Sequence, residues 1–562
     1  MTDLVKGDCW SFRDDVLDYL RLERDLIRQA IDEHKALDEE SRESLGLLIR
    51  SAVLIEDGES EARYATPNNL TKLRPGDEVR LVDVLTGASF VAYVDENDIE
   101  EMSFTFESSV AHPAHAMIVV EEINTLDQVI ARVSAFRPGA PGLGYLRVLA
   151  GLTEPRKVGF GAIDDVLKEE IPSTFNDAQR EAVLMAAKRP EVCHIQGTPG
   201  SGKTHLLAVV AGIFSRRGRD VVVVALTHQA VNNALNKIVL LDEALPVVKI
   251  GKPFKNIGLD ERVVQATGFR EYLAMCRERD GFMSKVGSIV GMTFQSALTN
   301  LCEIKSAFVP QTILFDEAGQ LPLTHGLAVG AFRCGSVVFV GDDAQMPPIY
   351  QSSLVSSPLS VSLFAHVKKR CPATGVVLNT TYRMCRGLAD FVSRRYYEPM
   401  GVTLTSAESA AGNLLIQSKP QWLRGDCKEI EFVECQNPGA CDENLVEARA
   451  VACRIKFLIE RGLLVDRLAV ITPYRRQVRL ILKVVKEYLP KLNRLPLIDT
   501  VERLQGQDVD VLLASFATDS IQYGFQNQGF IKNPNRLNVT FSRATSRVVV
   551  FGSELIRNFL GL

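Results

Sequence analysis

The chain has 562 residues, of which 46% are hydrophobic and 24% are charged, a composition typical of globular proteins that excludes fibrous and disordered chains. A formal net charge of −5 excludes a basic field over the whole surface, so any contact with nucleic acid must use local basic groups and backbone donors. The length exceeds that of a single core and predicts about three or four domains.

The first domain, residues 1–170, is predicted to contain a helix followed by a barrel. Apolar residues recur with the helical period among many charges at residues 12–34. Short β-type runs separated by turn residues then follow one another from about residue 52 to 121, which is typical of a small β-barrel. A Pro/Gly-rich passage at 136–144 predicts a return to helices.

The residues after 170 predict two α/β domains, 171–370 and 371–562. Continuous apolar runs alternate there with helical patterns, as in a parallel sheet covered by helices on both faces. These runs are 221–226, 312–315, 336–340, 468–472, 511–516 and 547–551. A polar, basic interval at about 251–285 lies between two strands of the first of these domains, and it is predicted to be a small inserted subdomain.

The sequence GTPGSGKT at 197–204 predicts a phosphate-binding loop, because it follows an apolar strand and precedes a helical pattern. Its glycines let backbone N–H groups close around phosphate oxygens at the positive end of the helix. Lys203 supplies a positive charge to the β- and γ-phosphates, and Thr204 supplies an oxygen to Mg²⁺. The predicted nucleotide contacts of the loop are Gly197, Pro199, Gly200, Ser201, Gly202, Lys203 and Thr204.

Two carboxylates and two arginines are candidates for the chemistry of phosphoryl transfer. Asp316 follows a buried strand and is predicted to hold Mg²⁺ directly or through water, while Glu317 is predicted to orient and deprotonate the attacking water. A bare Asp-Glu pair is usually a solvated turn, but its position after a strand downstream of a phosphate loop favours catalysis. Arg383 and Arg543 lie in the second α/β domain, and arginines supplied across an interface stabilise a transferring γ-phosphate well.

Seven motifs, in their order along the chain, resemble those of superfamily 1 helicases. They are FNDAQ, GTPGSGKT, FDEAGQ, GDDAQMPP, TTYRM, ERLQGQD and RLNVTFSRA. The resemblance covers about residues 171–555, and it is to the 5′→3′ group that includes the nonsense-mediated-decay RNA helicase, senataxin and the immunoglobulin mu-binding-protein helicase. It implies two tandem RecA-like domains that bind ATP, preceded by a helical stalk and a small β-barrel.

The resemblance also assigns roles around ATP to residues at matching positions. Gln179 would read the adenine, Tyr382 would stack on the base, and Gln345 would sense the γ-phosphate. Arg383 and Arg543 take the roles of arginine fingers.

Two further positions come from the motif ERLQGQD. Gly506 would allow close backbone approach to the nucleotide. Asp508 stands where the family has glutamate, and it would contact the ribose.

The family binds single strands through loops of both RecA-like domains. The matching residues are Thr227, His228, Gln229, Thr293, Phe294, Thr472, Pro473, Tyr474, Arg475 and Thr500. Hydroxyl and backbone N–H groups bind phosphates without reading sequence, and aromatic rings stack on bases. Core packing is the alternative for Phe294 and Tyr474. His228 and Gln229 depart from the Ser-Asn found in many relatives, so their contact details are open.

These residues predict an ATP-dependent helicase or translocase that moves 5′→3′ on single-stranded nucleic acid and acts on tailed duplexes. One alternative is a nucleic-acid-stimulated ATPase that clamps or remodels RNA– or DNA–protein complexes without processive unwinding. Another is a small-molecule kinase, which only the phosphate loop suggests. RNA and DNA both stay open as substrates.

The sequence also leads to expectations about location and partners. It contains no apolar stretch of the length of a signal peptide or a membrane span. We therefore expect a cytoplasmic monomer without membrane contact, with the nucleus as the alternative location. The sequence points to no particular protein partner.

Overall fold

The computed structural model describes residues 8–562 except 68, 99, 108–110, 123, 140–141, 157–164, 253–254, 257, 280–285, 304–309, 333, 412–428, 493 and 502–507. Its contacts group the chain into two compact units. The first unit comprises Met1–His194, Thr204–Gly341 and Pro348–Gly375, and the second comprises Ile195–Lys203, Asp342–Pro347 and Val376–Leu562. The second unit therefore includes most of the phosphate loop.

A long helix, α1 (Cys9–Ala36), begins the first unit and confirms the helix predicted at 12–34. The side chain of Asp8 caps it by accepting hydrogen bonds from the backbone N–H groups of Trp10 and Ser11. Its apolar face buries Phe12 and Val16 in the core of this unit. Burial of such side chains stabilises the fold by roughly 1.5–3 kcal/mol each.

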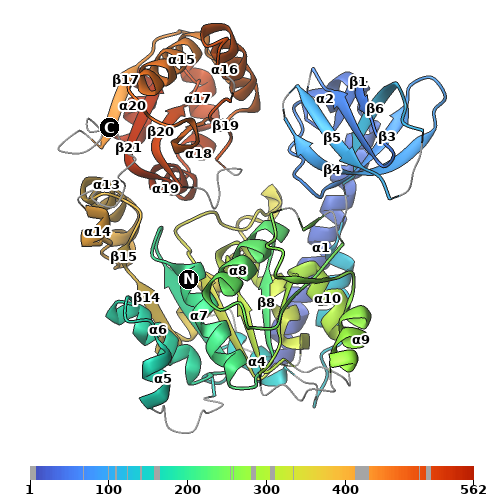
Figure 1. The fold of residues 1–562 in the computed structure, drawn as a ribbon, viewed down its shortest axis with the longest axis vertical. Helices are drawn as coiled ribbons and strands as arrows, with labels where there is room; N and C mark the ends of the chain where they lie inside the picture. Colours follow the sequence, from blue (N-terminus) through green and yellow to red (C-terminus); the bar gives the residue numbers. More distant parts are fainter. Residues whose placement is uncertain are drawn as a thin grey trace. The chain divides into compact units, whose positions relative to one another are not determined.

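A closed barrel of six strands follows, as the sequence predicted (Figure 1). Its strands are β1 (Leu48–Asp57), β2 (Glu61–Ala65), β3 (Glu78–Asp83), β4 (Ser89–Asn97), β5 (Glu101–Thr105) and β6 (His115–Val120). They are hydrogen-bonded in the order β1-β2-β5-β4-β3-β6, and β1 pairs antiparallel with both β2 and β6, which closes the barrel. Alternate residues of β5 are buried, since successive strand residues face opposite sides.

An eight-stranded sheet forms the α/β part of the chain that contains the phosphate loop. Its strands are β7 (Val192–Gly197), β8 (Val221–Ala225), β9 (Val247–Ile250), β10 (Val264–Ala266), β11 (Ile289–Thr293), β12 (Thr312–Phe315), β13 (Ser336–Gly341) and β14 (Gly375–Leu378). Their order is β10-β9-β11-β8-β12-β13-β7-β14. The edge strand β10 comes from the interval that was predicted to be an inserted subdomain, so this part of the interval extends the sheet.

Parallel pairing brings the carboxyl ends of several strands to one edge of this sheet. The register pairs Thr293 at the end of β11 with Ala225 at the end of β8, and Phe315 at the end of β12 with Val224. Residues that directly follow these three strands are therefore neighbours. In α/β sheets this edge is where ligands bind.

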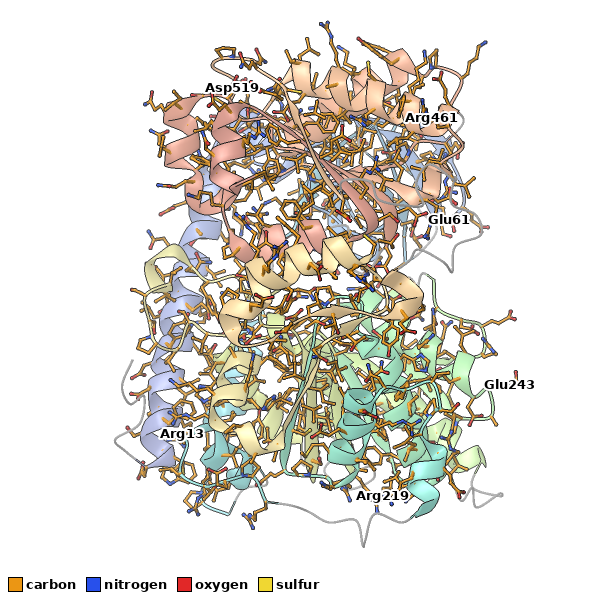
Figure 2. All side chains as sticks on the ribbon, turned by 90° about the vertical axis from the view of Figure 1, so that its left-hand side faces the viewer. Arg13, Glu61, Arg219, Glu243, Arg461 and Asp519 are labelled. Atoms are coloured by element: carbon orange, nitrogen blue, oxygen red, sulfur yellow. The ribbon has the colours of Figure 1, made fainter. Side chains whose placement is uncertain are left out.

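The first unit also contains helices before and between the strands of this sheet. They are α2 (Glu39–Ser44), α3 (Leu126–Ser134), α4 (Leu143–Leu149), α5 (Asp165–Glu170), α6 (Asp177–Ala187), α7 (Lys203–Arg216), α8 (His228–Leu241), α9 (Phe269–Arg279), α10 (Phe294–Glu303), α11 (Leu323–Gly326) and α12 (Leu363–Arg370). The first residue of α7, Lys203, is also the last residue of the segment Ile195–Lys203 of the second unit. Arg219, labelled in Figure 2, lies shortly after α7, and Glu243, also labelled there, lies in the turn after α8.

A second parallel sheet of five strands forms the core of the second unit. Its strands are β17 (Ile430–Glu434), β18 (Leu468–Ile471), β19 (Leu497–Asp499), β20 (Val509–Ser515) and β21 (Ala544–Gly552), in the order β17-β21-β20-β18-β19. A short pair, β15 (Thr380–Thr381) and β16 (Thr405–Ser406), precedes it. The two sheets confirm the tandem α/β architecture that the alternating apolar runs predicted.

The helices of the second unit accompany this sheet. They are α13 (Arg386–Val392), α14 (Glu408–Ala411), α15 (Leu445–Glu460), α16 (Arg475–Tyr488), α17 (Ile521–Gln526), α18 (Gln528–Ile531), α19 (Pro534–Ser542) and α20 (Glu554–Leu560). In Figure 2, Arg461 labels the chain directly after α15, and Asp519 the loop before α17.

Candidate nucleotide and nucleic-acid sites

The phosphate loop adopts a conformation that depends on its glycines. Gly200 and Gly202 have φ angles of +73° and +81°. Residues other than glycine adopt such angles only at a cost in free energy. A β-carbon on Gly200 would also lie 2.5 Å from Cβ of Arg383, so only glycine fits there. The Lys203 Nζ reaches back and donates a hydrogen bond to the carbonyl of Gly197 at 2.7 Å. Phosphate oxygens can therefore approach the backbone of the loop closely, and Lys203 supplies the positive charge that a triphosphate requires.

The segment that carries Arg383 is hydrogen-bonded to the phosphate loop. Thr198 donates to the carbonyl of Leu378 through its backbone N–H at 3.2 Å and its hydroxyl at 2.9 Å. The backbone N–H of Tyr382 donates to the carbonyl of Gly200 at 2.8 Å. These contacts place Arg383 beside the glycines of the loop. The Tyr382 side chain is 41% exposed, and its stacking on the base stays a prediction.

Three other residues of the loop, Pro199, Ser201 and Thr204, were also predicted to contact the nucleotide. Pro199 and Ser201 are buried, and the Ser201 hydroxyl donates to the carbonyl of Thr198 at 2.8 Å. Thr204 is the second residue of α7, directly after Lys203. The N-terminal end of this helix is thus formed by the residues predicted to bind phosphate and Mg²⁺.

Asp316 and Glu317 follow β12 at the carboxyl edge of the sheet. The backbone N–H of Asp316 donates to the carbonyl of Val224 at 2.8 Å, and the Asp316 carboxylate accepts from the backbone N–H of Glu317 at 2.9 Å. Glu317 has a φ angle of +53°, which is rare for a residue other than glycine. Such backbone strain concentrates at functional sites. Here the strained backbone sets the direction in which the Glu317 side chain extends.

Arg383 makes two contacts with its own unit. Its guanidinium forms an ion pair with the Asp508 carboxylate at 2.6 Å, and Nη1 donates to the carbonyl of Ser542 at 3.0 Å. Asp508 thus pairs with an arginine finger candidate in this structure, and its predicted ribose contact stays a prediction. Arg543 directly follows α19, is buried, and accepts from the backbone N–H of Val509 through its carbonyl. Gly506 lies outside the described residues.

Gln179 is buried at the start of α6. Its side-chain oxygen accepts from the backbone N–H of Asn176 at 3.0 Å, while its own N–H donates to the Asn176 side chain at 2.8 Å. This reciprocal pair is a capping box, which fixes the position of the glutamine at the helix start. Its role in reading adenine stays a prediction.

Asp342 is a buried carboxylate that the sequence analysis did not single out. It follows β13 and accepts hydrogen bonds from the side chains of Gln196 at 2.7 Å, Gln345 at 2.5 Å and Tyr397 at 2.7 Å. Burial raises its pKa, and the charge of Lys203 opposes that shift. The signal that we overlooked is the one used for Asp316: an acidic residue directly after a buried strand.

Thr227, His228 and Gln229 lie after β8 at the start of α8. Thr227 caps the helix by accepting from the backbone N–H of Ala230 at 3.2 Å, and Gln229 is exposed. Burial, together with the neighbouring charge of Lys249, lowers the pKa of His228 to about 3. The imidazole is therefore neutral at physiological pH and does not offer a positive charge to phosphates.

Thr293 is the last residue of the neighbouring strand β11, and Phe294 is the first residue of α10. The Thr293 hydroxyl accepts from the backbone N–H of Ser296 at 3.2 Å and caps α10. The Phe294 ring is only 4% exposed and packs against Phe315 and Phe332, with centroids 6.1 and 6.3 Å away. Phe294 is therefore a core residue in this structure, and its ring is not available to stack on a base.

Thr472 and Thr500 occupy corresponding places in the second sheet. They follow β18 and β19, which pair in parallel with Ile471 opposite Asp499. Thr472 is fully buried, and the Thr500 backbone N–H donates to the Asp499 carboxylate at 2.7 Å. The same carboxylate lies 3.5 Å from the Arg475 guanidinium, so this arginine is held by an ion pair at the edge of the sheet.

Tyr474 is partly buried in an aromatic cluster. Its ring lies 6.2 Å from Tyr523 and 5.8 Å from Phe530, and its hydroxyl accepts from Thr518 at 3.4 Å. Burial raises the pKa of this hydroxyl. These contacts support the packing alternative for Tyr474, while Pro473 beside it lines a small cavity at the ends of β18 and β20.

Both α/β regions of the chain are similar to known protein families. Two family models, each described as an AAA domain, match residues 174–360 and 359–555. The DNA replication ATP-dependent helicase/nuclease JHS1 of Arabidopsis thaliana is 26% identical over 68% of this chain and 28% of its own length. The corresponding DNA2 of Saccharomyces cerevisiae is 24% identical over 68% of this chain and 26% of its own length. The chain thus spans little more than a quarter of these relatives.

The chain is also similar to a yeast DNA helicase and to a viral helicase structure. The DNA polymerase alpha-associated DNA helicase A of Schizosaccharomyces pombe is 24% identical over 68% of this chain and 64% of its own length. The crystal structure of an Arterivirus nonstructural protein 10 (helicase) aligns over 94% of this chain and 84% of the viral chain. The two are 14% identical, with a TM-score of 0.42. The sequence matches support the resemblance to superfamily 1 helicases, and the narrower grouping with the nonsense-mediated-decay RNA helicase, senataxin and the immunoglobulin mu-binding-protein helicase stays a prediction.

Among the described residues, no helix is long and apolar enough to cross a membrane. Those residues also contain no cluster of three or more His, Cys, Asp or Glu side chains arranged to hold a metal ion.

Proposed function

We propose that this chain is an ATP-dependent helicase or translocase that moves along single-stranded nucleic acid in the 5′→3′ direction. The observation that carries the proposal is the hydrogen bond between Tyr382 N–H and the carbonyl of Gly200, which sets an arginine finger candidate on the phosphate loop. A nucleotide bound there contacts two catalytic elements that are far apart in sequence. Such an arrangement couples the nucleotide state to the relative placement of chain segments, as a motor requires.

The residues of the nucleotide site fit ATP with Mg²⁺. The glycine loop and Lys203 would bind the β- and γ-phosphates, and Thr204 with Asp316 would hold the metal. Glu317 orients and deprotonates the attacking water, while Arg383 and Arg543 stabilise the charge that develops on the transferred phosphate. Gln345 senses the γ-phosphate, Gln179 and Tyr382 hold the base, and Gly506 and Asp508 complete the site. Hydrolysis of bound ATP supplies the free energy for movement.

Threonines at the carboxyl edges of the two sheets support binding of a single strand. Thr227 lies after β8 and Thr293 ends the neighbouring strand β11 of the first sheet, and Thr472 and Thr500 follow neighbouring strands of the second. Hydroxyl and backbone N–H groups in such positions bind phosphates without reading sequence. By their names, the relatives act in DNA replication, so we include DNA among the substrates and keep RNA as the alternative.

The second candidate function is an ATPase that clamps or remodels nucleic-acid–protein complexes without processive unwinding. It uses the same nucleotide site. Placement of Phe294 in the core and Tyr474 in an aromatic cluster favours it, because neither ring is free to act as a stacking step along a strand.

Unwinding of tailed duplexes tests the direction and separates the two candidates. We expect the full chain, at substoichiometric concentration with ATP and Mg²⁺, to separate a duplex with a 5′ single-stranded tail and to leave a 3′-tailed duplex intact. Each substrate is made in DNA and in RNA and is followed by the release of a fluorescent strand.

The outcomes of this assay are distinct. Preferential unwinding of the 3′-tailed duplex would contradict the direction. Strand-stimulated ATP hydrolysis without unwinding of either duplex would favour the clamping ATPase. A blunt duplex serves as the control for tail-independent opening.

A further inference from the structure

We propose that Tyr397 and Asn538 are positioning residues that hold Gln345, through Asp342, in the place where it reads the γ-phosphate. The inference rests on the proposed function, because it assigns a role around the same nucleotide. All these residues belong to the second unit as its contacts define it.

Asp342 is the centre of the arrangement because it is a buried carboxylate in need of donors. It is 3% exposed, and a buried carboxylate without hydrogen bonds is strongly destabilising. Gln196, Gln345 and Tyr397 each donate to it. Gln196 lies on β7 directly before the phosphate loop, so the Asp342 carboxylate joins the base of that loop to the side chain of Gln345.

Tyr397 connects this carboxylate to the rest of the second unit. It ends a π-helical turn, Ser393–Tyr397, a rare conformation that often marks functional sites. Its hydroxyl donates to Oδ2 of Asp342 at 2.7 Å and accepts from Nδ2 of Asn538 at 3.0 Å. Gln345 donates to the same Oδ2 atom. The hydroxyl of Tyr397 and the amide of Gln345 are therefore held by one oxygen.

Helix α19 fixes the backbone of the same loop. Asn538 donates to the carbonyl of Ala344 at 2.8 Å, and Asn535 donates to the carbonyl of Gln345 at 2.6 Å. Residues three apart lie on one face of a helix, so both asparagines point to the loop. Arg543 directly follows this helix. The loop that carries Gln345 and the helix that leads to Arg543 are thus one hydrogen-bonded assembly.

A consequence for nucleotide recognition follows from these contacts. Gln345 can distinguish ATP from ADP only if its amide has a defined position when the γ-phosphate arrives. Removal of the Tyr397 hydroxyl leaves Asp342 with one donor fewer and frees Oδ2 to draw the Gln345 amide away from the nucleotide. The chain should then lose preference for a triphosphate over a diphosphate, whereas a general loss of stability would weaken both equally.

The variant Tyr397→Phe tests this, with Tyr396→Phe as its matched control. Tyr396 is the adjacent buried tyrosine and lies outside the set of hydrogen bonds to Asp342. We expect Tyr397→Phe to lower the preference for a non-hydrolysable ATP analogue over ADP, and kcat for ATP, by roughly tenfold each. Tyr396→Phe should keep the wild-type preference. Binding is measured by calorimetry and folding by thermal denaturation.

A double-mutant cycle with Gln345→Ala completes the test. Tyr397→Phe should have no further effect on the nucleotide preference once Gln345 is removed. An unchanged preference in Tyr397→Phe, equal losses for the analogue and ADP, or full additivity with Gln345→Ala would overturn the inference. Wild-type hydrolysis that ignores single strands would instead contradict the proposed function, so the two failures are distinguishable.

Discussion

Replacement of Glu317 by glutamine is expected to lower the turnover of ATP by roughly 10²- to 10⁴-fold, the usual contribution of a general base. Glutamine has nearly the shape of glutamate but does not accept a proton from water. Glu317 has a left-handed backbone conformation directly after the metal-binding candidate Asp316, and its backbone N–H, which the substitution keeps, donates to the Asp316 carboxylate. The variant should therefore fold and bind ATP with little change in affinity.

Turnover is measured by phosphate release and ATP affinity by binding of a fluorescent nucleotide. Glu181→Gln, on the exposed side of α6, makes the same chemical change at a residue without an assigned role and serves as the control. Undiminished phosphate release by Glu317→Gln would refute the assignment of the base. Equal losses in both variants would show that the effect is not local.

Replacement of Arg383 by alanine is expected to lower kcat by about 10³-fold or more, the contribution typical of an arginine finger. Its guanidinium now pairs with Asp508 and the carbonyl of Ser542, while its backbone lies beside Gly200. Because a positive charge at this place stabilises mainly the transition state, KM for ATP should change much less than kcat.

Arg386→Ala is the matched control, since Arg386 is an exposed arginine only three residues further along the chain. We expect it to retain wild-type kcat. A loss of ATP affinity in Arg383→Ala without a loss of kcat would contradict the role of a finger and would make Arg383 a ground-state binding residue. Steady-state kinetics at saturating single strand distinguish these outcomes.

Local sequence patterns were sufficient to predict several of the strands and the strand–loop–helix order around the phosphate loop. A parallel strand buried on both faces needs a continuous apolar run, so β8, β12 and β20 are visible in the sequence alone. The glycines of the loop are likewise dictated by local backbone geometry. The barrel was predictable because its short strands alternate apolar and polar residues between turn signals.

Contacts between residues far apart in sequence were not predictable. The pairing of Arg383 with Asp508, and of Asp342 with Tyr397, depends on how the chain returns to the same place. An aromatic residue at the end of a strand can face a sheet or solvent, so the pattern did not decide that Phe294 packs inward. The short run Gly375–Leu378 lies beyond the boundary predicted at residue 370 and yet joins the first sheet, which its own composition does not reveal.

The rate of ATP hydrolysis by the full chain, with and without a single-stranded oligonucleotide, tests whether the nucleotide site serves a nucleic-acid motor. We predict slow hydrolysis alone and strong stimulation by single-stranded DNA or RNA of mixed sequence, with a stimulation that weakens as salt increases. A rate that no oligonucleotide changes would contradict the proposal and would leave only an ATPase of another kind.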